Sequence, residues 1–319
     1  MFFYAVVLVR AAYAHDAGDA TRDGTLPFPE LTDFGALSVT AQPVTERVVL
    51  ITDPDGRIGG IVGAYLGDGG VVLVDSAYPQ AAARVDDVLR GLDAAPVRLV
   101  INTHWHVDHT DANVYWAEQG ARIVATDAVR RRRTVMQEIR LFGRSYDPLP
   151  NAGLPSITYV DRLTLRLFGQ TLHVRESNGH TDGDSIVHFV EENAFHLGDL
   201  SFGRQYPFLD VDTGGTWQGL IDSITWVLAR SNDESRYIPG HLLPGDPRPP
   251  YLDRSELEEY LAMLTTVHNR VADAKARGLT LDEAVAADLL ADLDPDWQRS
   301  PLVTSDLVVE TVYRTLGRP

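Results

Sequence analysis

Three histidines and an aspartate stand close together in the run His104-Trp105-His106-Val107-Asp108-His109. The run follows Val97–Ile101, an apolar segment that is typical of a buried strand. In an extended chain, residues two apart project to the same side, so His104 and His106 can bind one ion. Asp108 and His109 can reach a second ion as the chain turns into a helix. Histidines scattered on a surface loop are the alternative, but imidazole and carboxylate groups are ligands that zinc prefers. The run therefore predicts two metal positions, roughly 3.5–4 Å apart as in other two-metal sites.

Three later segments each place a side chain of ligand type in the loop after an apolar strand. They are Gly179–Asp184, which contains His180, then Gly198–Leu200, which contains Asp199, and Ile238–His241. The glycine in each segment lets the backbone turn sharply, so the following side chain can point into a cleft. Layered α/β folds gather active residues at strand ends. Each segment alone could be an ordinary turn, but their order after the histidine run predicts that they complete the same site.

Other polar residues near these segments are candidates for supporting roles. Asp75 ends the apolar strand Val71–Val74, where it could cap a turn or accept a hydrogen bond that fixes the tautomer of a metal-bound histidine. Asp182, in the His180 segment, is assigned the same supporting role. The segment after Asp199 is expected to line the cleft, with Arg204 binding a substrate carboxylate and Tyr206 donating to an oxyanion. For Arg204 the alternative is an ion pair with an aspartate downstream, at position 210 or 212.

The elements that must position these residues alternate along the first half of the chain. Short strands are expected at 37–41, 47–52, 60–66 and 71–74, followed by a helix from Pro79 and the strand before the histidine run. A helix at 113–118, a strand at 122–125 and a helix after a cap at Asp127 come next. Antiparallel strands follow, between residues 158 and 197. After a proline-rich break at 244–250, a capping box at Ser255 and Glu258 predicts a helix, and two more helices are expected at 281–290 and 305–316. The alternation predicts a layered α/β fold.

Composition restricts the chemistry and the partners. The 319 residues are 44% hydrophobic, and 45 acidic residues against 28 basic ones give a net charge of −17. Such a surface repels phosphate backbones, so we expect a small-molecule substrate and no nucleic acid. The chain contains no cysteine, which excludes disulfides and thiolate ligands. Any metal site must therefore use nitrogen and oxygen donors.

The amino-terminal segment is expected to lie outside the folded domain. Residues 1–14 have the form of a truncated secretory signal, with an apolar stretch and an A-x-A triplet, although a short amphiphilic or disordered start is the alternative. Residues 15–35 are expected to form a flexible leader. No segment approaches the roughly 20 apolar residues of a membrane span. A periplasmic or secreted location is expected, and otherwise a cytoplasmic one.

The run His104-x-His106-x-Asp108-His109, with the three later segments in order, resembles the H-x-H-x-D-H signature of the metallo-β-lactamase superfamily. The resemblance covers roughly residues 36 to 245. It implies an α/β (α+β) fold, a four-layer αββα sandwich at 36–249, with a helical C-terminal extension at 250–319 packed on it. It also implies two zinc ions. The first would be bound by His104, His106 and His180, the second by Asp108, His109 and His241, with Asp199 bridging both.

The resemblance implies a dinuclear zinc hydrolase in which a bridging hydroxide, oriented by Asp108, attacks an acyl carbonyl of an ester, lactone, thioester or lactam. Members with cysteine at the position of Asp199 include well-known β-lactamases, whereas an aspartate there is similar to glyoxalase II and lactonases. Three alternatives remain open, namely a β-lactamase proper, an iron-dependent oxidoreductase similar to persulfide dioxygenases, and a non-catalytic metal-binding module. Iron or manganese could replace zinc.

Overall fold

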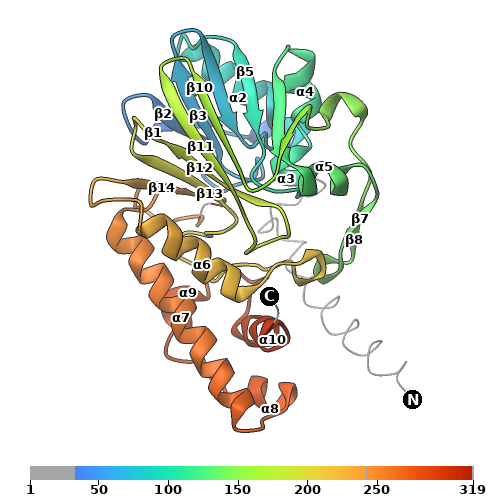
Figure 1. The fold of residues 1–319 in the computed structure, drawn as a ribbon, viewed down its shortest axis with the longest axis vertical. Coiled ribbons are helices and arrows are strands. Elements are labelled where there is room, and N and C mark those ends of the chain that lie inside the picture. Colours follow the sequence, from blue (N-terminus) through green and yellow to red (C-terminus); the bar gives the residue numbers. More distant parts are fainter. Residues whose placement is uncertain (1–32, 242, 318–319) are drawn as a thin grey trace.

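The computed structural model describes residues 33–241 and 243–317. Two β-sheets lie against each other, and helices cover the outer face of each sheet (Figure 1). The expected signal and nearly all of the expected leader lie outside the described residues. Within the described part of the chain, no helix combines the length and the apolar character needed to cross a membrane.

The first sheet has seven strands in the order β1-β2-β3-β4-β5-β6-β9. Strands β1 to β4 pair antiparallel, and β4, β5, β6 and β9 pair parallel. The bounds are β1 Thr40–Pro43, β2 Val48–Thr52, β3 Val62–Gly67, β4 Gly70–Val74, β5 Val97–Ile101, β6 Arg122–Thr126 and β9 Ile157–Tyr159.

The second sheet has five strands in the order β10-β11-β12-β13-β14. All pairs are antiparallel except β13 with β14, which is parallel. The bounds are β10 Arg162–Leu167, β11 Gln170–Ser177, β12 Asp184–Phe189, β13 Ala194–Gly198 and β14 Arg236–Pro239. Parallel neighbours end at the same edge of a sheet, so β4 and β5 in one sheet, and β13 and β14 in the other, each end together.

Helices form the two outer layers. On the first sheet lie α2 (Pro79–Gly91), α3 (Val107–Thr110), α4 (Asn113–Glu118) and α5 (Asp127–Arg133). On the second lie α6 (Trp217–Leu228) and α7 (Arg254–Ala276), which pack against each other. The helices α8 (Leu281–Ala286), α9 (Asp294–Trp297) and α10 (Ser305–Thr315) pack on these helices. Figure 1 shows α6 and α7 beneath the second sheet, with α10 beside them.

The alternation of side chains along each strand explains the four layers. In β2, Val48 and Leu50 belong to the apolar cluster between the sheets, whereas Val49 and Ile51 belong to the cluster under α2. In the second sheet, Val187 faces the first sheet, and its neighbour Ile186 joins the cluster with α6, α7 and α10. Successive residues of a strand point to opposite faces, so strands covered on both faces are apolar throughout. The expected αββα sandwich with C-terminal helices is confirmed.

Two local expectations differ from the structure. The capping box of α7 is formed by Asp253 and Glu256, two residues before the expected pair, because the Asp253 side chain accepts from the Glu256 backbone. The first-sheet helix expected to begin with Asp127 as its cap is capped by Thr126. After α5, where the sequence predicted no element, the chain forms a hairpin of β7 (Gln137–Ile139) and β8 (Arg144–Tyr146). Gly143, at a φ of 60°, permits its turn.

Candidate metal centre

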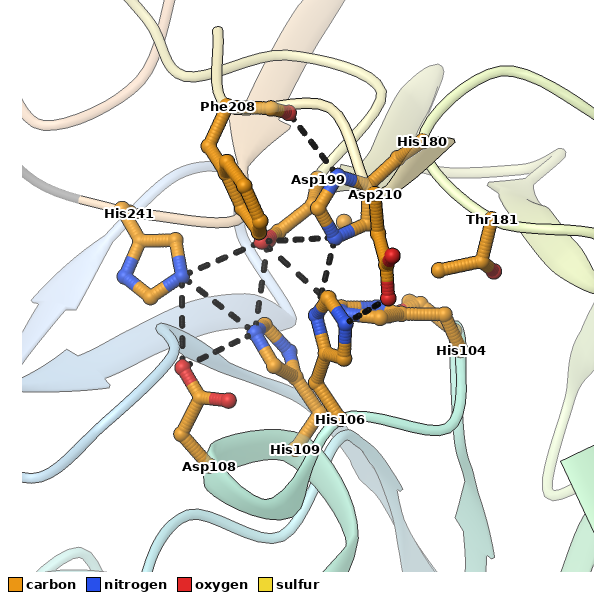
Figure 2. A network of polar contacts seen from close by, with 12 residues as sticks. His104, His106, Asp108, His109, His180, Thr181, Asp199, Phe208, Asp210 and His241 are labelled. Atoms are coloured by element: carbon orange, nitrogen blue, oxygen red, sulfur yellow. Dashed lines mark hydrogen bonds and ion pairs between the residues drawn. The ribbon is translucent and has the colours of Figure 1, made fainter. Parts of the chain in front are cut away.

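Seven side chains of ligand type converge where strands of both sheets end (Figure 2). Asp199 follows β13, and the loop after β5 carries the histidine run into α3. One group, whose ligand atoms lie within 4.8 Å of one another, consists of His104, His106, His180 and Asp199, and a second consists of Asp108, His109 and His241. The structure therefore brings together every residue that the sequence predicted as a ligand.

Asp199 lies between the two groups. One carboxylate oxygen is 3.3 Å from His109 Nε2, and the other is 3.2 Å from His241 Nε2 and 3.4 Å from His180 Nε2. On the other side of the second group, Asp108 Oδ2 is 3.5 Å from His109 Nε2 and 3.4 Å from His241 Nε2. The Asp199 carboxylate can therefore reach a cation in either group.

Four of the histidines have a hydrogen-bond acceptor on the ring nitrogen that faces away from the cluster. His109 Nδ1 is 2.8 Å from Asp75 Oδ2, and His106 Nε2 is 3.1 Å from Asp210 Oδ2. His180 Nδ1 is 2.9 Å from the carbonyl oxygen of Phe208, and His104 Nδ1 is 3.0 Å from Thr103 Oγ1. We assign the proton of each neutral ring to this outer nitrogen. The inner nitrogen of each ring then directs a lone pair into the cluster, as metal-bound histidines require.

The inner nitrogens lie close together with no proton between them in this assignment. His106 Nδ1 and His180 Nε2 are 2.9 Å apart, and His109 Nε2 and His241 Nε2 are 3.4 Å apart. In addition, His104 Nε2 and Asp199 Oδ1 are buried and have no hydrogen-bond partner among the described residues. Facing lone pairs and unpaired buried polar atoms are costly unless a cation lies among them. The donor set of nitrogens and oxygens thus fits divalent metal ions.

The pKa directions agree with this fit. Burial lowers the pKa of His104 well below its ordinary value and that of His180 to about 4, so both rings are neutral and able to bind metal at pH 7. For Asp108, burial favours the protonated form, but His109 and His241 outweigh it and lower the pKa to about 2. For His109, burial favours the neutral ring, but neighbouring carboxylates raise the pKa well above its ordinary value. The carboxylates therefore favour positive charge at the second group, either as a second proton on His109 or as a metal ion that takes the place of this proton on the inner nitrogen.

Two glycines, Gly60 and Gly240, let the backbone pass close to the side chains of His109 and Asp199. A Cβ atom on Gly60 would lie 2.3 Å from the His109 ring, and one on Gly240 would lie 1.9 Å from Asp199 Oδ1. Real Cβ atoms essentially never approach other heavy atoms this closely. Both positions therefore require a residue without a side chain.

The supporting carboxylates are only partly those expected from the sequence. Asp75, at a φ of 66°, accepts from Thr103 N at 2.7 Å as well as contacting His109. Asp182 instead binds Arg132 of α5, at 2.6 and 2.7 Å, and contacts no ligand histidine in the described contacts. The loop of His180 is held by Asp184, which accepts from the His180 backbone at 2.7 Å. Asp184 was missed because β12 begins at this residue and its carboxylate turns inward.

Arg204 and Tyr206 are held by the C-terminal extension, which differs from their expected roles toward a substrate. The Arg204 guanidinium binds Glu256 of α7, and neither Asp210 nor Asp212 is its partner in the described contacts. The Tyr206 hydroxyl donates to Asp294 of α9 at 2.9 Å, and its side chain is buried. Both therefore anchor the segment after Asp199 to the helices behind it.

Residues 58–241 match the family model of the metallo-beta-lactamase superfamily. The alpha subunit of 2,4-dinitroanisole O-demethylase from Nocardioides sp. (strain JS1661) is 26% identical over 250 residues, which cover 77% of this chain and 68% of that protein.

Solved structures have the same fold. The stereoselective inverting sec-alkylsulfatase Pisa1 from Pseudomonas sp. is 17% identical with a TM-score of 0.64, and the match covers 88% of this chain and 51% of that one. A metallo-beta-lactamase from Cronobacter sakazakii is 17% identical with a TM-score of 0.60, and the match covers 78% of this chain and 100% of that one. At these identities the likeness concerns the fold alone, and this chain spans about half the length of the alkylsulfatase.

Proposed function

Because the chain belongs to the metallo-beta-lactamase superfamily, we propose that it is a hydrolase with two zinc ions that cleaves an acyl substrate such as an ester, lactone, thioester or lactam. The observation that carries the proposal is the set of inner nitrogens and unpaired buried atoms that converge from both sheets. We assign residues 36–249 to the catalytic domain and residues 250–319 to a helical extension packed on it.

Each side chain has a distinct role in this proposal. His104, His106 and His180 hold the first ion, Asp108, His109 and His241 hold the second, and Asp199 bridges them. When bound, the ions lower the pKa of a coordinated water to about 7 and polarise the substrate carbonyl.

The residues around the ligands keep the imidazoles oriented. Asp75 and Asp210 hold the outer protons of His109 and His106, so these rings cannot turn away from the centre. Asp108 is partly exposed, with 18% of its side chain accessible. It can therefore accept a hydrogen bond from the nucleophile and orient that nucleophile toward the substrate.

Metal analysis is the first test. The purified chain should bind two zinc ions, and His104→Ala should bind fewer. The matched control is His173→Ala, because His173 is an exposed histidine on β11 outside the cluster. A protein that takes up about one iron and no zinc would contradict the hydrolase proposal and favour an iron-dependent oxidoreductase.

A substrate panel is the second test. The zinc-loaded protein should hydrolyse at least one of a chromogenic cephalosporin, acyl-homoserine lactones, S-lactoylglutathione and aryl acetates. The names of two similar proteins favour a second candidate, cleavage of a carbon–oxygen bond in an aryl ether or an alkyl sulfate. The panel therefore includes 2,4-dinitroanisole and a secondary alkyl sulfate. If only 2,4-dinitroanisole or the alkyl sulfate is cleaved, the substrate is an ether or a sulfate ester and the proposed acyl substrate is wrong. Two bound zinc ions without turnover of any compound would favour a non-catalytic module.

A further inference from the structure

Two phenylalanine rings, those of Phe202 and Phe208, pack against histidines of the candidate metal centre. Phe208 stacks on His106, with ring centroids 6.2 Å apart and planes at 22°, and meets His180 edge-on at 5.6 Å. Phe202 stacks on His241, with centroids 5.3 Å apart and planes at 17°. Figure 2 shows the Phe208 ring directed toward the cluster. The surroundings of the ligand histidines are thus apolar and aromatic.

The hairpin of β7 and β8 extends this aromatic surface away from the ligands. Phe142, in the turn of the hairpin, lies 5.2 Å from Phe208 with the ring planes at 41°. Both rings are only partly buried, and both pack against an apolar cluster that includes Trp105 and Ile139. We call Phe142, Phe202 and Phe208 the aromatic wall.

The charged side chain next to Phe142 in the hairpin has acidic partners. Arg140, beside Phe142 in the hairpin, lies 3.5 Å from Asp212 and 3.9 Å from Glu138. The outer nitrogens of His106 and His180 are bound by Asp210 and by the Phe208 carbonyl. The ring faces of the wall themselves offer neither a hydrogen-bond donor nor a charge. A substrate group that contacts them gains through apolar and ring-to-ring contact.

We propose that the aromatic wall binds an uncharged aromatic ring of the substrate, attached next to the bond that is cleaved. This inference rests on the proposed function, because it takes the reacting group to lie at the metal centre. A substrate carbonyl there would bring its substituent within reach of Phe208, and Phe142 would cover the outer side of that substituent. An aromatic substituent fits better than a flexible chain because tilted ring pairs are a preferred contact geometry and a rigid ring loses little conformational entropy.

The test compares two ligands that bind metal through the same group. Acetohydroxamate and benzohydroxamate share the chelating hydroxamate and differ by a phenyl ring in place of a methyl group. Binding to the zinc-loaded protein is measured by calorimetry, so that no turnover is required. We expect benzohydroxamate to bind at least tenfold more tightly, and Phe142→Ala to reduce this preference to less than threefold, with zinc content unchanged.

Two further variants complete the experiment. Phe168→Ala removes a phenylalanine near the start of β4, the end of that strand opposite the metal centre, and should keep the full preference. Phe142→Leu retains an apolar side chain in the hairpin without the ring, and an intermediate preference is expected. Equal affinities of the wild type for the two hydroxamates, or an unchanged preference in Phe142→Ala, would overturn the inference.

Kinetics then separate this inference from the proposed function. Methyl phenylacetate and methyl propionate release the same alcohol and, like the hydroxamates, differ on the acyl side by a phenyl ring in place of a methyl group. Phe142→Ala should lower kcat/KM for methyl phenylacetate about tenfold and leave that for methyl propionate within twofold. If neither these esters nor any acyl substrate of the panel is hydrolysed while the hydroxamate preference is present and depends on Phe142, the acyl hydrolase proposal fails and the aromatic wall stands.

Discussion

Replacing Gly240 by alanine should damage the metal centre with little change elsewhere. A Cβ atom at this position would lie 1.9 Å from Asp199 Oδ1, 2.7 Å from the carbonyl carbon of Gly198 and 2.8 Å from Asp199 N. The side-chain oxygen could turn away, but the two backbone atoms belong to the end of β13 and to the residue that follows it. The segment that carries Asp199 and the segment that leads to His241 would therefore have to separate.

The expected size of the effect follows from these distances. Real contacts to Cβ atoms essentially never fall under 3.0 Å, so the two backbone atoms at 2.7 and 2.8 Å must move by roughly 0.2–0.3 Å and Asp199 Oδ1, at 1.9 Å, by roughly 1 Å. Metal-to-ligand distances vary by only about 0.2 Å in intact sites. We expect the affinity for zinc to fall at least as far as when a supporting residue is removed, about 10–100-fold. Overpacking should also lower the free energy of unfolding by about 1–3 kcal/mol.

The assay is a competition titration with a chromophoric zinc chelator, combined with urea unfolding of the metal-free protein. Gly91→Ala is the matched control, because Gly91 ends α2 and a Cβ there would meet nothing within 4 Å. This control should keep its zinc affinity and gain a few tenths of a kcal/mol or more from better helix propensity. A Gly240→Ala protein that binds two zinc ions as tightly as the Gly91→Ala protein would refute the reasoning.

Three other perturbations have distinct expected outcomes. Asp210→Asn should weaken zinc binding about 10–100-fold in the same titration, because His106 loses its carboxylate acceptor, whereas Asp212→Asn should not. Arg204→Ala should lower the free energy of unfolding in urea by about 1–3 kcal/mol through loss of the Glu256 pair, and a rise in KM for an anionic substrate would instead restore its expected role in recognition. Burial lowers the pKa of His188 in the folded protein to about 4. As the pH falls from 6.5 to 4, His188 is therefore protonated in the unfolded chain while it stays neutral in the folded protein. The free energy of unfolding should fall by at most about 3 kcal/mol in that window, and His188→Phe, which keeps the stack on Phe195, should show a smaller slope.

The cluster of ligand-type side chains could be predicted from the sequence because its signal is local. His104 and His106 stand two apart after a strand, and the three later ligands each stand close to a glycine at a strand end. Such spacings determine side-chain direction without knowledge of distant contacts. The layered α/β architecture could be predicted from the alternation of strand and helix patterns, whereas the four-layer αββα arrangement was implied by the resemblance to the metallo-β-lactamase superfamily.

The supporting residues could not be predicted because their partners are distant in the sequence. Asp210 contacts His106, which lies 104 positions earlier, and no sequence spacing predicts a contact over that distance. Asp182 and Asp184 look equivalent in the loop of His180, and only the packing of α5 against that loop directs Asp182 to Arg132. Tyr206 follows Asp199 closely in the chain, but its hydroxyl donates a hydrogen bond to Asp294, which lies 88 positions after Tyr206.

The distribution of the ligands over both sheets has a thermodynamic consequence. His104 to His109 follow β5 of the first sheet, whereas Asp199 and His241 follow β13 and β14 of the second, so the complete site exists only when the two sheets are packed together. An unfolded chain retains the histidine run but not the geometry that joins it to the later ligands. An ion that binds the folded state alone stabilises it by about 2.7 kcal/mol at a free concentration one hundred times the Kd. Zinc binding and the packing of the sheets should therefore support each other, and a chain that loses either should lose part of the other.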